Sequence, residues 1–304
     1  MRPKNSDYKN DTEFQQFQES IKDKSPSTAK SYKASYKKVR DLLGKAIRDT
    51  AEETVIKVIQ VDNENINTQQ ALINICILTR KLAPEMPILR LVEQRTINKG
   101  EVIEVLKQAN TLKDLPSLEE YDQYLDSLWT AGKYREFIVN YLLRHHYVRN
   151  LDLIFDIVTT KAETLDSTKN WLWLDRRNLR CVYIRNTYKT AKTYGQKTVV
   201  IDNERFMFAA KRCMKSMYCF PITEDPMLIG YYVHKMTMLN SKGQRLGEGD
   251  CLKIIVNHYR DNVQKLEEIS KSRGTNFKVL ITSYNISFNK DMDKDLSTYH
   301  PSTP

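Results

Sequence analysis

Glycine and proline are scarce in this sequence, with 9 of each among 304 residues. The glycine-rich P-loop and G-x-G-x-x-G phosphate-binding motifs are both absent. No apolar run approaches the roughly 18 residues that a bilayer span requires. The opening stretch MRPKNSDYKNDTEF also lacks the apolar core of a signal peptide. We therefore expect no membrane-spanning segment and no secretion.

Cysteine is too sparse and too scattered for a disulfide framework or a zinc site. The five cysteines are an odd number, and Cys213 and Cys219 have no nearby His or Cys partner for zinc. Reduced thiols of this kind are typical of a cytosolic or nuclear compartment. We expect all five to be reduced: Cys76, Cys181, Cys213, Cys219 and Cys251.

Motifs for metal or nucleophilic catalysis are also missing. The chain has no H-E-x-x-H motif, no acidic metal cluster, and no serine-triad or cysteine-protease context. The sequence thus predicts no cofactor and no metal, so any chemistry would depend on Arg, Lys and Tyr. The histidines are scattered without metal-ligand spacing: His145, His146, His234, His258 and His300.

Basic residues exceed acidic ones, and this excess points to a polyanionic partner. Lys and Arg total 48 against 38 Asp and Glu, which gives a net charge of +10. The sequence pI is about 9.2. Such a balance favours nucleic acid first and an anionic membrane surface second.

The predicted helix Pro26–Asp49 has two contrasting faces. Ser25-Pro26 is typical of a helix N-terminus. One face carries an apolar stripe that includes Tyr36 and Val39, and another is basic. The basic face is either simply solvated or lies along a phosphate backbone. The DNA-contact interpretation assigns four residues to it: Lys30, Lys33, Lys37 and Arg40.

Composition and periodicity divide the chain into four parts. We expect a disordered segment at 1–12, a helical domain at 13–112, a second domain at 116–288 and a polar tail at 289–304. The helical domain holds four or five helices, including 67–82 and 99–109, and a Ser117/Glu120 capping box opens the second domain. The fold class is mainly α with a small β-hairpin or three-stranded sheet. The expected strands are 171–174, 181–185 and 197–201, and the expected later helices are 203–217, 226–239, 250–268 and 270–284.

The stretch Tyr134–Val158 places one arginine, Arg149, between two apolar blocks. An arginine in that position is expected near the interior, where its guanidinium needs a partner. Asp152, three residues later, is close enough to orient it. Alone, this pattern also fits a structural ion pair at a helix junction.

The order of the charged residues resembles the catalytic domain of the tyrosine recombinases, the phage-integrase superfamily. That order is Arg149 in YLLRHHYVRNLDL, a lysine on a β-hairpin, Arg273 in SKSRGT, and a late tyrosine. Upstream, SPSTAKSYKASYKKVRDLLG is similar to the family's helical core-binding domain. LPSLEEYDQYLDSL is similar to the start of its catalytic domain.

The resemblance implies a metal-free and ATP-free cleavage of DNA through a 3′-phosphotyrosyl intermediate. Arg149 and Arg273 would neutralise the phosphorane, with Asp152 in support. Lys189, in a Lys-Thr dipeptide, would protonate the leaving 5′-oxygen, with Lys192 as the second choice. Tyr299 is the implied nucleophile. Tyr284 is excluded because one helix from Ser270 would place it about 16 Å from Arg273.

Two departures from the family pattern leave an alternative open. Ser270 stands where the family has the histidine of its His-x-x-Arg box, and no His or Trp occupies the assisting position near Leu296. The alternative is an inactive recombinase-fold protein with a DNA-binding, packaging or virion-structural role. In either case double-stranded DNA is the expected partner, with a tetramer on DNA if the protein is active. A viral or mobile-element origin is expected, with a location in the host cytoplasm, nucleus or virion.

Overall fold

The computed structural model describes residues 8, 11–63, 65–112, 114–214 and 220–284. Over these residues the chain is mainly α-helical with one small four-stranded mixed sheet, which confirms the predicted fold class. The chain divides into two compact units, residues 1–109 and 110–304. The boundary between the units, at residues 109–110, precedes the predicted boundary at 112–116 by a few residues. Most of the predicted disordered segment 1–12 and the whole tail 289–304 lie outside the described residues.

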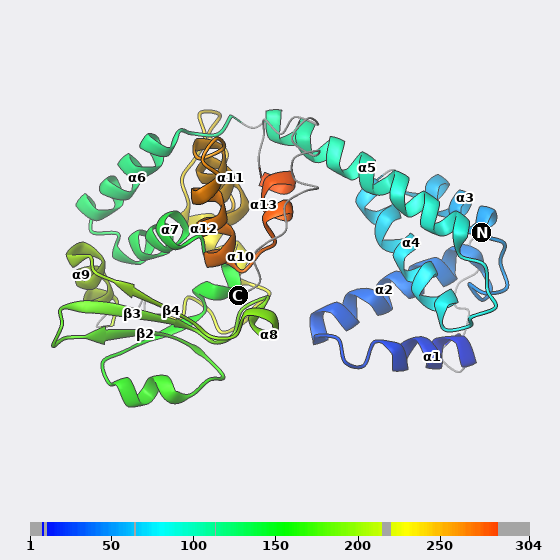
Figure 1. Ribbon diagram of the computed structural model, residues 1–304, viewed down its shortest axis with the longest axis horizontal. Coiled ribbons are helices and arrows are strands. Elements are labelled where there is room, and N and C mark those ends of the chain that lie inside the picture. The colour runs from blue at the N-terminus through cyan, green and yellow to red at the C-terminus, as the bar shows by residue number, and fades with distance from the viewer. Residues whose placement is uncertain (1–7, 9–10, 64, 113, 215–219, 285–304) are drawn as a thin grey trace. The chain divides into compact units, whose positions relative to one another are not determined.

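The N-terminal unit is a bundle of helices (Figure 1). Ser25 caps the second helix by accepting a hydrogen bond from the Thr28 amide, as its sequence predicts. This helix ends at Gly44, which has φ 67°, and so it is shorter than the predicted Pro26–Asp49. The helices of this region are α1 (Thr12–Ser20), α2 (Pro26–Leu43), α3 (Glu52–Asp62), α4 (Ile66–Lys81) and α5 (Leu89–Leu112).

A buried carboxylate, Glu13, organises the core of this bundle. Its Oε1 accepts hydrogen bonds from Tyr36 Oη at 2.8 Å, Arg40 Nη1 at 3.0 Å and the Ile47 amide at 3.0 Å. Its Oε2 accepts from the Arg48 amide at 2.9 Å. The carboxylate therefore joins α1 to α2 and to the turn that follows α2.

The assignment of Arg40 to the DNA-contacting face is wrong. Arg40 is only 6% exposed, and its Nη1 lies 3.0 Å from Glu13 and 2.7 Å from Asp11. Periodicity placed it among the basic residues, but its partners lie one helix earlier and draw it into the core. The other three predicted contacts are exposed on α2: Lys30, Lys33 and Lys37.

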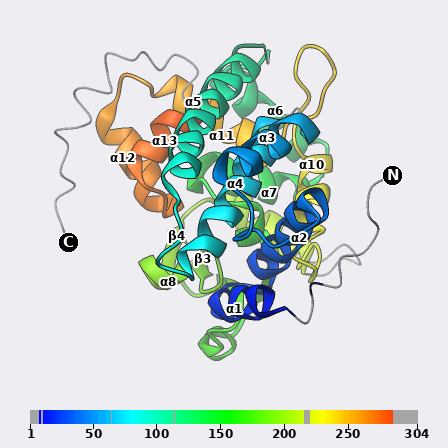
Figure 2. The ribbon, with the colours of Figure 1, turned by 90° about the vertical axis from the view of Figure 1, so that its right-hand side faces the viewer.

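The C-terminal unit contains the sheet and the remaining helices (Figures 1 and 2). Its helices begin with α6, where Ser117 and Glu120 form the predicted capping box. The helices are α6 (Leu118–Thr130), α7 (Tyr134–His146), α8 (Ala191–Tyr194), α9 (Glu204–Cys213), α10 (Ile229–Met236), α11 (Glu248–His258), α12 (Val263–Arg273) and α13 (Phe277–Tyr284). Two 3₁₀ turns complete the unit: η2 (Asn150–Leu153) and η3 (Lys161–Leu165).

The three predicted strands are present, and a fourth strand precedes them. The strand order is β1 (Phe155–Val158), β2 (Asn170–Asp175), β3 (Arg180–Arg185) and β4 (Lys197–Ile201). β1 pairs with β2 in parallel, and the other pairs are antiparallel. β1 escaped prediction because its four residues lie inside an apolar run that shows no alternation.

The sheet is covered on both faces. One face contributes Leu172 and Tyr183 to the main core, which it shares with α7 and α9. The other face forms a smaller cluster with Trp171 and Ile184, next to η3. Because the sheet is buried on both sides, its strands read as apolar runs with little alternation.

The predicted helix boundaries after residue 248 are wrong. The chain forms α11, α12 and α13 there, which lie side by side in both ribbon views (Figures 1 and 2). Asn262 caps the start of α12 by accepting from the Lys265 amide at 3.0 Å. Gly274, with φ 63°, ends that helix. None of the helices in the described ranges is long and apolar enough to cross a membrane.

Replacing Arg40 with methionine should destabilise the N-terminal unit by about 3 kcal/mol, because it leaves Glu13 buried without its guanidinium partner. Lys37→Met is the matched control on the exposed face of the same helix, and its cost should be below about 0.5 kcal/mol. Urea unfolding of both variants measures the difference. Equal stabilities would contradict the buried position of Arg40.

Candidate functional site

The backbone around Arg149 is fixed by a left-handed turn and by a carboxylate. α7 ends at His146, and Tyr147 follows with φ 55°. The Arg149 amide then donates to Asp152 Oδ2 at 3.1 Å. Asp152 therefore supports Arg149 through its main chain, whereas the sequence predicted a bond to its guanidinium. Since Asp152 is fully buried, this turn has little freedom.

The half-buried guanidinium of Arg149 contacts only neutral oxygens in the described part of the chain. Its Nη2 donates to Thr275 Oγ1 at 2.9 Å and to the Gly274 carbonyl at 3.2 Å. Its Nη1 lies 3.5 Å from Thr190 Oγ1, at the edge of hydrogen-bonding distance. Burial and the neighbouring Arg273 charge lower the pKa of Arg149. An anion placed here would relieve both effects.

Gly274 allows these segments to approach each other. A Cβ at this position would lie 2.8 Å from Thr190 Oγ1 and 3.3 Å from Lys197 Nζ. Its φ of 63° also favours glycine. The residue therefore serves both the end of α12 and the contact with the β3–β4 connection.

Arg273 lies deeper than Arg149 and joins three further segments. It is 3% exposed. Its Nη1 donates to the carbonyls of Tyr147 at 3.0 Å and Val148 at 3.2 Å. Its Nη2 pairs with the Glu248 carboxylate and lies 3.4 Å from Tyr284 Oη. Arg273 thus connects the end of α7 with the start of α11 and the end of α13.

The structure places Tyr284 inside the site, which corrects the prediction that it lies about 16 Å from Arg273. A single helix from Ser270 to Tyr284 would have kept the two apart. Gly274 breaks that helix, and Asn276 accepts from the Lys278 amide at 2.9 Å to start α13. The second helix folds back, and the Tyr284 ring lies 5.5 Å from the Arg273 guanidinium carbon.

Lys197, which the sequence analysis did not single out, lies beside Gly274 and is half-buried. Its Nζ donates to the Ser272 carbonyl at 3.1 Å and to the Lys271 carbonyl. Burial, then Arg185 and Arg149, lower its pKa to about 8. Lys197-Thr198 is a third Lys-Thr dipeptide in this part of the sequence, so the dipeptide pattern could have identified Lys197 as a candidate. The two lysines that the sequence favoured are exposed: Lys189 and Lys192.

A buried ion pair, Arg185–Asp152, supports the site from the end of β3. Arg185 is 1% exposed, and its Nη1 lies 3.1 Å from Asp152 Oδ2. Its Nη2 donates to the Ser272 carbonyl at 3.0 Å. Burial raises the pKa of the Asp152 carboxyl, and the Arg185 charge opposes this shift. Arg185 was absent from the predicted site because its apolar strand gave no sign of a charged partner.

These residues form what we name the Arg149 cluster. Its members come from segments that are far apart in the sequence: Arg149, Asp152, Arg185, Lys197, Glu248, Arg273 and Tyr284. The predicted nucleophile Tyr299 lies outside the described residues. Lys30, Lys33 and Lys37 belong to the other unit.

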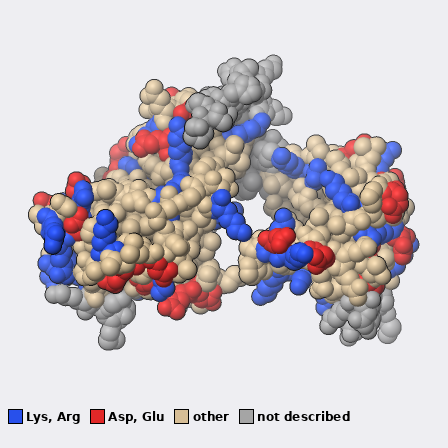
Figure 3. All heavy atoms as spheres, turned by 60° about the horizontal axis from the view of Figure 1, so that its bottom comes forward, with Lys and Arg blue, Asp and Glu red and all other residues tan. Residues whose placement is uncertain are grey.

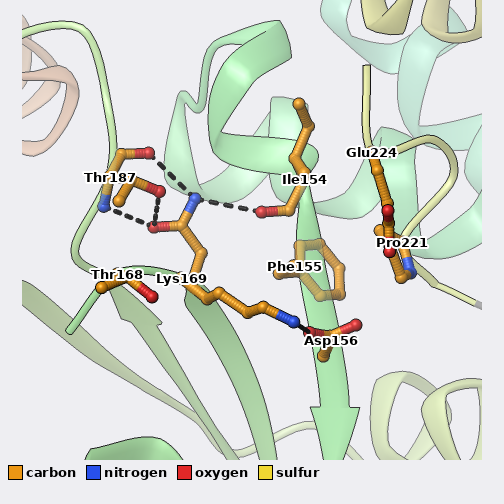
Figure 4. A pocket seen from close by; sticks show the side chains of 9 residues that line it. Ile154, Phe155, Asp156, Thr168, Lys169, Thr187, Pro221 and Glu224 are labelled. Carbon is orange, nitrogen blue, oxygen red and sulfur yellow. Dashed lines mark hydrogen bonds and ion pairs between the residues drawn. The ribbon is translucent and has the colours of Figure 1, made fainter. Parts of the chain in front are cut away.

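Asn170 fixes the β3–β4 connection to the segment that follows Arg149. Its Nδ2 donates to the carbonyls of Ile154 at 3.1 Å and Thr187 at 3.0 Å. Its Oδ1 accepts from the amides of Asn186 and Thr187, both at 2.8 Å. Figure 4 shows the bonds that involve Ile154 and Thr187 beside a pocket of about 290 Å³, where Lys169 pairs with Asp156.

No protein-family profile matches the chain, and no curated protein matches it. Among solved structures the chain is similar to one described as the crystal structure of XerA recombinase. The TM-score is 0.35 and the sequence identity is 12%, with 95% of this chain and 98% of that chain covered. The likeness is weak, so the geometry of the Arg149 cluster must decide what the site can do.

Asn170→Ala should destabilise the protein by about 2 kcal/mol, because it leaves two part-buried amides and two part-buried carbonyls without this partner. Its neighbour provides the control, since Lys169→Ala removes an exposed ammonium that pairs with Asp156 and lies over the Trp171 ring, and should cost less than about 1 kcal/mol. Denaturant titration of the two variants gives both values. The positioning role of Asn170 fails if the two costs are equal.

Proposed function

We propose that the chain binds duplex DNA and that the Arg149 cluster holds one backbone phosphate for strand cleavage of the tyrosine-recombinase type. The observation that carries this proposal is the half-buried Arg149 guanidinium, whose hydrogen-bond partners Thr190, Gly274 and Thr275 are neutral. A desolvated guanidinium without a contacting carboxylate favours an anion. Its planar donors suit two oxygens of a phosphodiester.

The charge of the cluster supports an anionic ligand. Four cationic side chains face two carboxylates, so the cluster carries about two excess positive charges below the pKa of Lys197. Arg149 and Lys197 are the half-buried members on the positive side. Because they flank Gly274 together, they are the residues proposed to contact the phosphate.

The proposed reaction uses residues that already lie together. The Tyr284 phenol oxygen attacks phosphorus and loses its proton to solvent, which forms the phosphotyrosyl bond. The bond from phosphorus to the 5′-oxygen breaks, and Lys197 gives that oxygen its proton. Rejoining reverses both steps. Arg149 neutralises the phosphorane, and Arg273 positions Tyr284.

A second function, DNA binding without cleavage, is favoured by one observation. Arg273 is 3% exposed and pairs with Glu248, so in this form it presents no open face to a phosphate. Ser270 also replaces the histidine of the family's box. Under this alternative, Arg149 and Lys197 hold a phosphate that is never attacked.

Incubation with a nicked suicide duplex separates the two functions. Wild type should form an SDS-resistant adduct, and Tyr284→Phe should lose it while Tyr231→Phe, at an exposed tyrosine, keeps it. Arg149→Ala should lower the cleavage rate by about 10²-fold or more.

Two results would overturn parts of this account. An adduct that is lost in Tyr299→Phe but kept in Tyr284→Phe would make the tail residue the nucleophile. DNA binding with no adduct from wild type would favour binding without cleavage.

The role of Lys197 predicts a pH dependence with a definite sign. Its folded-state pKa of about 8 lies below the ordinary lysine value of 10.5, so the ammonium that donates the proton is lost as pH rises through 8. The cleavage rate should therefore fall above about pH 8.

Lys197→Ala should slow cleavage about 10²- to 10⁴-fold. A substrate with sulfur at the bridging 5′ position should restore the cleavage rate of this variant, because the thiolate leaves without a proton. Lys189→Ala should be nearly neutral with both substrates. Equal losses in Lys197→Ala with oxygen and sulfur leaving groups would mean that Lys197 only packs against α12.

A further inference from the structure

The turn between β2 and β3 is held in one conformation by Asp175. Asp175 pairs with Arg180 across the two strands, so the turn consists of the four residues 176–179. The Asp175 carboxylate accepts from Asn178 Nδ2 at 2.7 Å, from the Asn178 amide at 3.4 Å and from Arg180 Nε at 3.2 Å. The turn is therefore presented to solvent in a fixed shape.

Two adjacent arginines, Arg176 and Arg177, lie exposed on this turn. Neither forms an ion pair within the described residues. Elsewhere in this unit, exposed arginines do pair with acids, as Arg205 does with Asp126 at 2.6 Å. At the end of the unit where Figure 1 places the β2–β3 turn and α9, Figure 3 shows Lys and Arg side chains on the left of the view, with acidic side chains beside them. The two arginines of the turn therefore remain available to an anionic partner.

Leu179 completes the turn in an unfavourable conformation. It has φ 53°, a region where glycine or asparagine is the usual residue, and its side chain is 71% exposed. At this position leucine neither favours the backbone conformation nor buries its side chain in the core. Strain of this kind accumulates where a side chain serves a binding surface.

The turn lies at the far end of β3 from the Arg149 cluster. Arg185 closes the strand at the cluster, and Arg180 opens it at the turn. At about 3.3 Å per residue, the two ends are roughly 17 Å apart. This equals about five base-pair steps along duplex DNA, at about 3.4 Å per step.

We propose that the β2–β3 turn is a second DNA contact, with Arg176 and Arg177 on backbone phosphates and Leu179 in the minor groove. Arginines beside an exposed apolar side chain are the combination with which proteins enter that groove. The turn would contact the duplex several base pairs from the phosphate at Arg149. This inference rests on the proposed function, because it assigns a second contact to the same DNA.

The salt dependence of binding tests the arginines. The double variant Arg176→Ala/Arg177→Ala should lower the slope of log K against log salt by about 1.8, since each phosphate contact contributes about 0.9. Lys235→Ala/Lys242→Ala removes the same charge from exposed positions outside the sheet and should leave the slope unchanged. Equal slopes in the two double variants would overturn the contact. A turn that instead binds acidic protein would give that result.

Leu179→Gly separates binding from stability. Relief of the left-handed conformation should raise Tm, while loss of the apolar side chain should weaken DNA binding several-fold. If Leu179 has only a structural role, the substitution should change Tm and DNA affinity in the same direction. An unchanged affinity would overturn the placement of Leu179 in the groove.

The inference and the proposed cleavage can fail separately. If the arginine variant binds and forms adducts as wild type does, the turn is not a contact but the cleavage proposal stands. If wild type forms no adduct, yet its salt slope still depends on Arg176 and Arg177, the turn is a contact on a protein that does not cleave.

Discussion

The positive charge of Arg273 holds the candidate site together. Buried at 3% exposure, it draws in two main-chain carbonyls at the end of α7 and the Glu248 carboxylate at the start of α11. The same guanidinium lies beside Tyr284. A buried guanidinium must satisfy its donors, so this requirement brings the Arg149 segment and α13 to one place. Without it, the Tyr147 and Val148 carbonyls and the Glu248 carboxylate would lose this common partner.

The two arginines consequently differ in what they can do. The donors of Arg273 are bound by carbonyls and a carboxylate of the protein, so this residue positions its neighbours. Arg149 contacts only neutral oxygens in the described residues, which is why it is the arginine proposed to hold an anion. Lys197 also lies beside Gly274, with a pKa of about 8. The proposed phosphate site therefore uses Arg149 and Lys197, whereas Arg273 belongs to the scaffold that holds them.

Local signals in the sequence predicted the local structure, and tertiary partners decided the rest. The Ser117 capping box and three strands could be predicted because turn chemistry and apolar runs are short-range features. Arg40 was wrongly assigned to the exposed face because helical periodicity cannot show that its partner, Glu13, lies in another helix. The distance from Tyr284 to Arg273 was wrongly predicted because apolar periodicity continues through Gly274, where the chain reverses. Three Lys-Thr dipeptides looked alike, and only the burial of Lys197 distinguishes it.

The central claim is that Arg149 and Lys197 together hold one DNA phosphate. A crystal structure of the protein bound to a nicked duplex tests it most directly. The account predicts one backbone phosphate within hydrogen-bonding distance of the Arg149 guanidinium and of Lys197 Nζ, with the Tyr284 hydroxyl facing its phosphorus. A duplex bound elsewhere on the protein, with no phosphate at Arg149, would contradict it.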